Sequence, residues 1–185
     1  MDEETKLFEA YKIAINARNT TYDNLHKWMT FYYVAVGAIF IAYYTISDDK
    51  QIKILLTILG FITSVVWHLS CKGYYFWILN WINVIGHIEN KLPETMRVYF
   101  IFSEDVEKDK NDLFNPRKPA NISTAKITIF FSLLIAITWA FLFFHVCCDN
   151  IQEWLIQLVC AILATMAIIF FGRFFTSDLK QHIKF

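Results

Sequence analysis

Residues that break helices, and charged residues, are missing from long parts of this 185-residue chain. It has only five glycines and three prolines, so most of it is free to form helix. It contains no glycine-rich phosphate loop, no GxSxG, no HExxH, and no CxxC among its four cysteines. These absences remove the common enzyme and zinc-site signatures. A formal net charge of zero also gives no general attraction to nucleic acid.

The charge-free parts are four hydrophobic blocks. No Asp, Glu, Lys or Arg lies inside any of them, and the blocks are residues 28–46, 54–69, 127–147 and 154–172. Each is about long enough to cross a bilayer as a helix, the second once its aromatic continuation is included. The sequence therefore predicts an all-α integral membrane protein with four transmembrane helices.

The second span continues beyond the length that hydrocarbon requires. From residue 67 onward its bulky residues recur at steps of four and three, until Pro93 ends the pattern. This spacing predicts one helix over 52–92, about 60 Å long, with a coiled-coil-like seam. The seam packs either on the chain's own N-terminal helix or on another subunit. Its residues are Trp67, Cys71, Tyr74, Ile78, Trp81, Ile85, Ile88 and Leu92.

Lysine and arginine gather on one side of the predicted membrane. They flank the spans in the N-terminal segment, the region between spans two and three, and the tail, whereas the opposite side has only Lys50 and Lys53. This bias predicts that both termini are cytoplasmic. Residues 1–27 then form a cytoplasmic amphipathic helix and no signal peptide, 93–123 a cytoplasmic linker, and 173–185 a cytoplasmic tail.

Polar residues within the helices have modest interpretations. Gly60 and Ser64 form a small-xxx-small pair, and Gln157 suits hydrogen bonding between helices. Along the extension a polar side is either a solvated face or the lining of an oligomer's vestibule. It consists of Asn80, Asn83, His87, Glu89 and Asn90.

No metal or cofactor site is predicted. His68 and His145 fall at opposite ends of the predicted membrane, so they do not share a metal within one chain. Cys147 and Cys148 are adjacent but have no nearby set of further ligands.

The first half of the chain resembles the RipA family of small octameric bacterial membrane proteins. The resemblance rests on the placement of aromatic and polar residues: Tyr11-Lys12, Ala17-Arg18-Asn19, Lys27-Trp28, Trp67, Tyr74-Tyr75-Phe76-Trp77, Asn80-Trp81-Ile82, Glu89 and Leu92-Pro93. It implies an inner-membrane homo-oligomer without assigned chemistry, with an octamer as one stoichiometry.

Two functions from different classes are consistent with these patterns. The first is a non-enzymatic, self-assembling membrane scaffold, or an effector that perturbs the membrane when a cytoplasmic ligand arrives. Small membrane effectors of bacterial defence systems share this plan by analogy. The alternative is a subunit of an ion channel or small-solute transporter. The expected partners are membrane lipids, further copies of the chain and an unknown cytoplasmic ligand.

Overall fold

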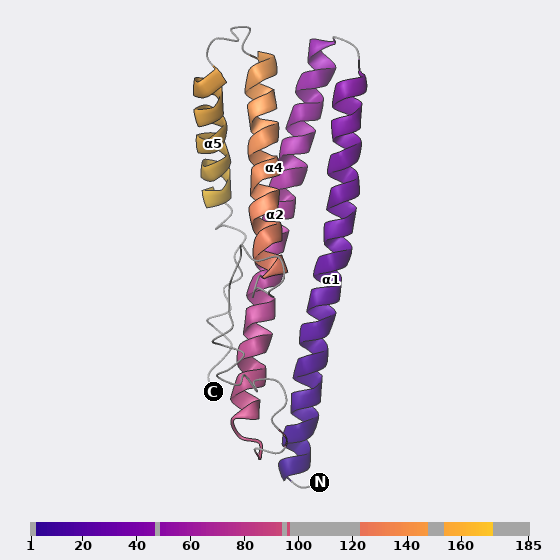
Figure 1. Cartoon of the computed structure of the whole chain (residues 1–185), viewed down its shortest axis with the longest axis vertical. Coiled ribbons are helices and arrows are strands. Elements are labelled where there is room, and N and C mark those ends of the chain that lie inside the picture. The colour runs from indigo at the N-terminus through magenta and orange to yellow at the C-terminus, as the bar shows by residue number, and fades with distance from the viewer. Residues whose placement is uncertain (1–2, 47–48, 94–95, 97–122, 148–153, 172–185) are drawn as a thin grey trace, which may run out of the picture. The chain divides into compact units, whose positions relative to one another are not determined.

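The computed structural model describes residues 3–46, 49–93, 96, 123–147 and 154–171. These residues form four long helices, α1 (Glu3–Thr45), α2 (Lys50–Glu89), α4 (Thr124–Cys147) and α5 (Trp154–Phe171), which are coloured in chain order in Figure 1. Each is long and apolar enough to cross a membrane, which confirms the predicted all-helical, four-span architecture. The predicted tail at 173–185 lies outside the described residues, and so does nearly all of the predicted linker at 93–123.

The two long helices begin and end where local chemistry favours it. α1 has Glu3 and Glu4 in its first turn, where negative charge complements the helix dipole. α2 is capped by Asp49, whose carboxylate accepts hydrogen bonds from the backbone N–H of Gln51 at 2.9 Å and of Ile52 at 3.3 Å. It ends at Glu89, shortly before Pro93. α1 is continuous across the predicted junction between residues 27 and 28.

The helices contribute to two compact units. Unit 1 contains residues 1–28 and 72–128, and unit 2 contains residues 29–71 and 129–185. Within α2 the chain has no charged residue between Lys53 and Lys72, a rise of about 27 Å that matches the hydrocarbon core. Unit 2 therefore holds the parts of the helices that cross the membrane.

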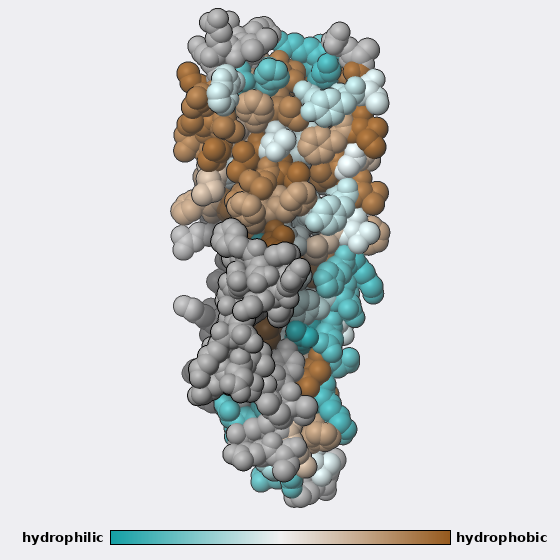
Figure 2. All heavy atoms as spheres, in the orientation of Figure 1, coloured by the Kyte–Doolittle hydropathy of each residue, from teal (hydrophilic) through white to brown (hydrophobic). Residues whose placement is uncertain are grey.

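The surface of unit 2 is suited to lipid. Hydrophobic side chains gather on its visible face, over α1, α4 and α5 (Figure 2). Large exposed apolar residues occur on all four helices, among them Val34, Leu55, Phe130 and Leu163. Such a surface is unfavourable in water and favourable against acyl chains.

A close contact between α2 and α4 depends on Gly60. Trp139 of α4 is fully buried, and its indole ring lies where a Cβ at Gly60 would stand. Phe40 stacks on the same indole at a centroid distance of 4.2 Å, and Tyr43 meets it edge-on at 6.0 Å. Ser64, the other half of the predicted small-residue pair, is buried and donates to the Gly60 carbonyl oxygen at 2.7 Å. The glycine thus admits an aromatic ring from another helix.

We expect Gly60→Ala to destabilise unit 2, because the new methyl group overlaps the Trp139 indole. The cost should be about 1–3 kcal/mol, typical of overpacking, and should lower the Tm of the protein in detergent. Gly37→Ala is the matched control, since a Cβ there meets nothing within 4 Å. Equal melting temperatures for the two variants would contradict the contact.

Candidate functional site

All eight seam residues are at least partly covered, seven of them on α2 and Leu92 just beyond its end. Five are buried: Trp67, Cys71, Ile78, Ile85 and Leu92. The other three, Tyr74, Trp81 and Ile88, are half-buried. The four-and-three spacing therefore follows one face of the helix, as the geometry of 3.6 residues per turn requires.

In unit 1 the seam packs on the N-terminal helix of the same chain. Buried Tyr11 and Ala14 of α1 form one core with Ile85 and Leu92. Partly buried apolar residues surround this core: Leu7, Phe8, Ile15, Trp81, Val84 and Ile88. The part of the seam from Trp81 to Leu92 therefore packs on α1 of the same chain, which is one of the two alternatives that the sequence leaves open.

A buried polar pair lies beside this core. The Tyr11 hydroxyl donates a hydrogen bond of 3.1 Å to Oε1 of Glu89, and these side chains are only 3% and 2% exposed. The assignment of Glu89 to the polar side of the helix is therefore wrong. Glu89 follows Ile85 by four residues and precedes Leu92 by three, so it belongs to the seam face.

The rest of the predicted polar side is on the accessible surface of α2. Asn83, His87 and Asn90 are exposed, and Asn80 is half-buried. The spacing of Glu89 from Ile85 and Leu92 was the signal in the sequence that it lies on the seam face, away from the exposed polar residues. A carboxylate is placed on a covered face only where hydrogen bonding offsets the cost of burial.

The seam begins in unit 2, where its first residue, Trp67, belongs to an aromatic cluster. The fully buried Trp67 stacks on Tyr32 at a centroid distance of 5.9 Å. It meets Tyr33 and Phe131 edge-on at 4.9 Å and 5.9 Å. Trp67 therefore joins α1, α2 and α4 through the ring geometries that aromatic pairs prefer.

Next to Trp67, polar groups pair across the same three helices. Nδ1 of buried His68 lies 3.0 Å from the Ile129 carbonyl oxygen and 3.2 Å from the Ser132 hydroxyl. The Tyr32 and Ser70 hydroxyls lie 3.2 Å apart. From the sequence, His68 was considered only as a candidate metal ligand. Its place in an uncharged span was the available signal, because polar groups in spans usually bond to another helix.

Two further predicted features fall in unit 2. Gln157 is buried on α5, on the same face as Ala161 and Thr165, and Thr165 donates to the Ala161 carbonyl oxygen at 2.7 Å. Among the cysteines, Cys71 is buried, Cys147 and Cys160 are exposed, and Cys148 lies outside the described residues. Within the part of the chain that the structure describes, no three His, Cys, Asp or Glu residues gather as metal ligands.

The sequence that forms most of α1 and all of α2 and α4 matches the model of a known family. A model described as the octameric membrane protein family (8xMP) matches residues 8–148. The chain belongs to the octameric membrane protein family. No curated protein and no solved structure matches the chain. The match to the octameric membrane protein family extends through α4, beyond the first half that carried the resemblance. It supports the family at this level and leaves the narrower name RipA unsupported.

In this member of the octameric membrane protein family, we expect Tyr11 and Glu89 to be energetically coupled. A double-mutant cycle of Tyr11→Phe and Glu89→Gln should give about 1–3 kcal/mol, typical of a buried hydrogen bond to a charged group. Hydrogen exchange of α1 amides in unit 1 measures the effect locally.

The matched control is the exposed pair Lys12–Glu9, whose ammonium and carboxylate lie 3.4 Å apart. A cycle of Lys12→Gln and Glu9→Gln should give no more than about 1 kcal/mol. Coupling no larger at Tyr11 and Glu89 than at this surface pair would show that the buried pair does not hold unit 1 together.

Proposed function

We propose that this chain is the subunit of a homo-octameric, non-enzymatic scaffold of the bacterial inner membrane. In this proposal unit 2 is the membrane anchor, and unit 1 is the cytoplasmic part that receives a ligand or partner. The observation that carries it is the use of the seam: α2 continues past the hydrocarbon to build a second core with α1. A helix pair so placed gives a membrane assembly a protein surface outside the lipid.

The self-assembly part of the proposal is supported by the family description and by an uncovered surface on unit 1. Phe76, Trp77 and Leu79 of α2 are 55%, 40% and 41% exposed, although the neighbouring seam residues are covered. Clustered apolar side chains of this size are typical of interaction surfaces. We propose that neighbouring subunits cover them.

The alternative, a channel or transporter subunit, has less support. Selective permeation paths usually present backbone carbonyl or charged groups to the axis of the assembly. In the described part of unit 2, the contact of His68 with Ile129 and Ser132 joins two helices of one chain. Ser64 and Thr165 bond within their own helices. The His68 contact joins α2 to α4, and Ser64 and Thr165 satisfy their own hydroxyl groups, so none of these groups requires a polar path between subunits.

The first test is the mass of the assembly and its conductance. Native mass spectrometry in lipid nanodiscs should give about 174 kDa, eight times the chain mass of 21.8 kDa. Phe76→Ser with Trp77→Ser should shift this population to smaller species, whereas Asn83→Ser on the same helix should not. A monomeric wild-type protein would contradict the proposal. Steady, ion-selective flux into liposomes without any added ligand would favour the channel alternative.

The second test addresses orientation. In a cysteine-free background, a membrane-impermeant maleimide should label Gln51→Cys in intact spheroplasts and Glu4→Cys only after permeabilisation. The reason is the excess of lysine and arginine on the side of the N-terminus. Both positions are exposed, so accessibility to solvent is matched. The reverse pattern of labelling would contradict cytoplasmic termini.

A further inference from the structure

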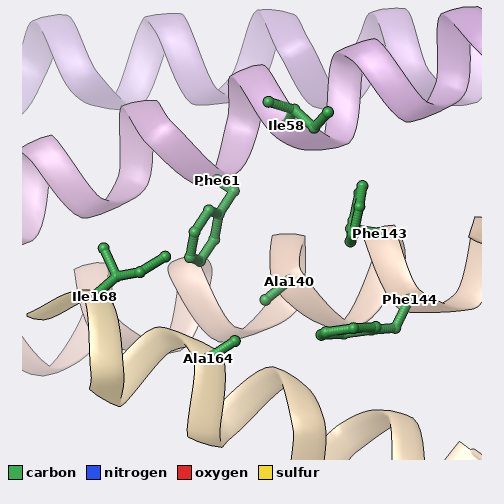
Figure 3. Close-up of a pocket in the computed structure, with 7 residues that line it drawn as sticks. All are labelled: Ile58, Phe61, Ala140, Phe143, Phe144, Ala164 and Ile168. Atoms are coloured by element: carbon green, nitrogen blue, oxygen red, sulfur yellow. The ribbon is translucent and has the colours of Figure 1, made fainter.

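An apolar pocket lies among α2, α4 and α5 within unit 2. It encloses about 220 Å³, and all of its lining side chains are hydrocarbon, as Figure 3 shows. The lining consists of Ile58, Phe61, Ala140, Phe143, Phe144, Ala164 and Ile168. Ile58 and Ile168 are about two-fifths exposed, whereas Ala140 is only 5% exposed. The pocket therefore has a buried wall and an accessible rim.

Two alanines leave the space open. Ala140 of α4 and Ala164 of α5 each line the pocket with only a methyl group. The rings of Phe61, Phe143 and Phe144 surround this space (Figure 3). Close-packed interiors rarely keep such volumes, because side chains lining an open space lose dispersion contacts. The pocket therefore has the size and lining to bind a small apolar ligand.

The depth of the pocket in the membrane and its lining indicate which kind of molecule it binds. Ile58 and Phe61 follow Lys53 by five and eight residues, a rise of about 7.5 and 12 Å into the uncharged part of α2. At that depth the surrounding medium is the acyl chains of one leaflet. No polar atom lines the pocket, so nothing in it would recognise a headgroup or a polar solute.

We propose that this pocket binds one acyl chain of a membrane phospholipid. The volume exceeds the roughly 150 Å³ of an engineered apolar cavity that holds benzene. The volume is too small for a helix, which is about 10 Å wide with its side chains. A single flexible hydrocarbon chain enters from the rim at Ile58 and Ile168 and contacts the three phenylalanine rings. The lipid then joins α5 to α2 and α4.

The proposal is tested by photolabelling of the full-length protein in phosphatidylcholine vesicles. A trace phosphatidylcholine carries a diazirine in the middle of one acyl chain, and mass spectrometry of peptides locates the adducts. Adducts on Phe143, Phe144 and Ile168 should exceed those on the lipid-exposed Leu163 and Phe170 by about fivefold or more. A probe with its diazirine next to the glycerol should show no such preference.

Paired variants on α5 separate the pocket from the general lipid surface. Ala164→Phe fills the pocket and should reduce its labelling about fivefold, whereas Ala167→Phe, three residues away at an exposed position, should leave it unchanged. The comparison of positions within the wild-type protein holds even if Ala164→Phe does not fold.

Three results would overturn the proposal. One is equal labelling of pocket and exposed positions in the wild-type protein. Another is an equal loss of labelling in both alanine variants. The third is labelling of the pocket only after the assembly is dissociated, which would mean that a side chain of a neighbouring subunit fills it. Because the proposal concerns one chain, wild-type labelling supports it whatever the mass of the assembly proves to be.

Discussion

Hydrocarbon offers no hydrogen-bond partners, and the interior of unit 2 depends on this constraint. Helical backbone satisfies its own polar groups. Buried Ser64 and Thr165 donate to carbonyl oxygens four residues earlier in the same helix, and His68 bonds to the backbone of α4. The indole nitrogen of Trp139 is an exception, since it is buried without a hydrogen-bond partner. Its ring instead fills the space that Gly60 leaves and stacks on Phe40.

Unit 1 also buries a polar group that requires a hydrogen-bond partner, and a neighbouring helix provides it. Here α2 has left the uncharged run, and its seam is covered by α1 of the same chain. The buried carboxylate of Glu89 requires a donor, and the Tyr11 hydroxyl supplies one across 78 positions of sequence. A directional hydrogen bond among apolar contacts adds specificity to the pairing of the two helices, because a shifted register would bury Glu89 without this donor.

Membership of the octameric membrane protein family agrees with a chain that leaves two kinds of apolar surface uncovered. The surface of unit 2, with its pocket of hydrocarbon side chains, has the chemistry of lipid. The exposed aromatic residues of unit 1 lie on the helix that also carries the intrachain seam. In the proposed assembly, one helix therefore provides a contact within the subunit and another between subunits.

The sequence by itself determined the four spans and indicated that the second helix is longer than a span, because uncharged runs and the spacing of bulky residues depend only on local composition and helix geometry. The helix ends at Glu89, before the predicted end at residue 92. The sequence also placed the seam residues on one face. Only the tertiary structure decided which partner covers that face in unit 1, because any apolar helix would satisfy the same periodicity. The burial of Glu89, the ring of Trp139 over Gly60 and the pocket beside Ala164 were likewise decided there. Each depends on what a neighbouring helix presents, which spacing along one helix does not encode.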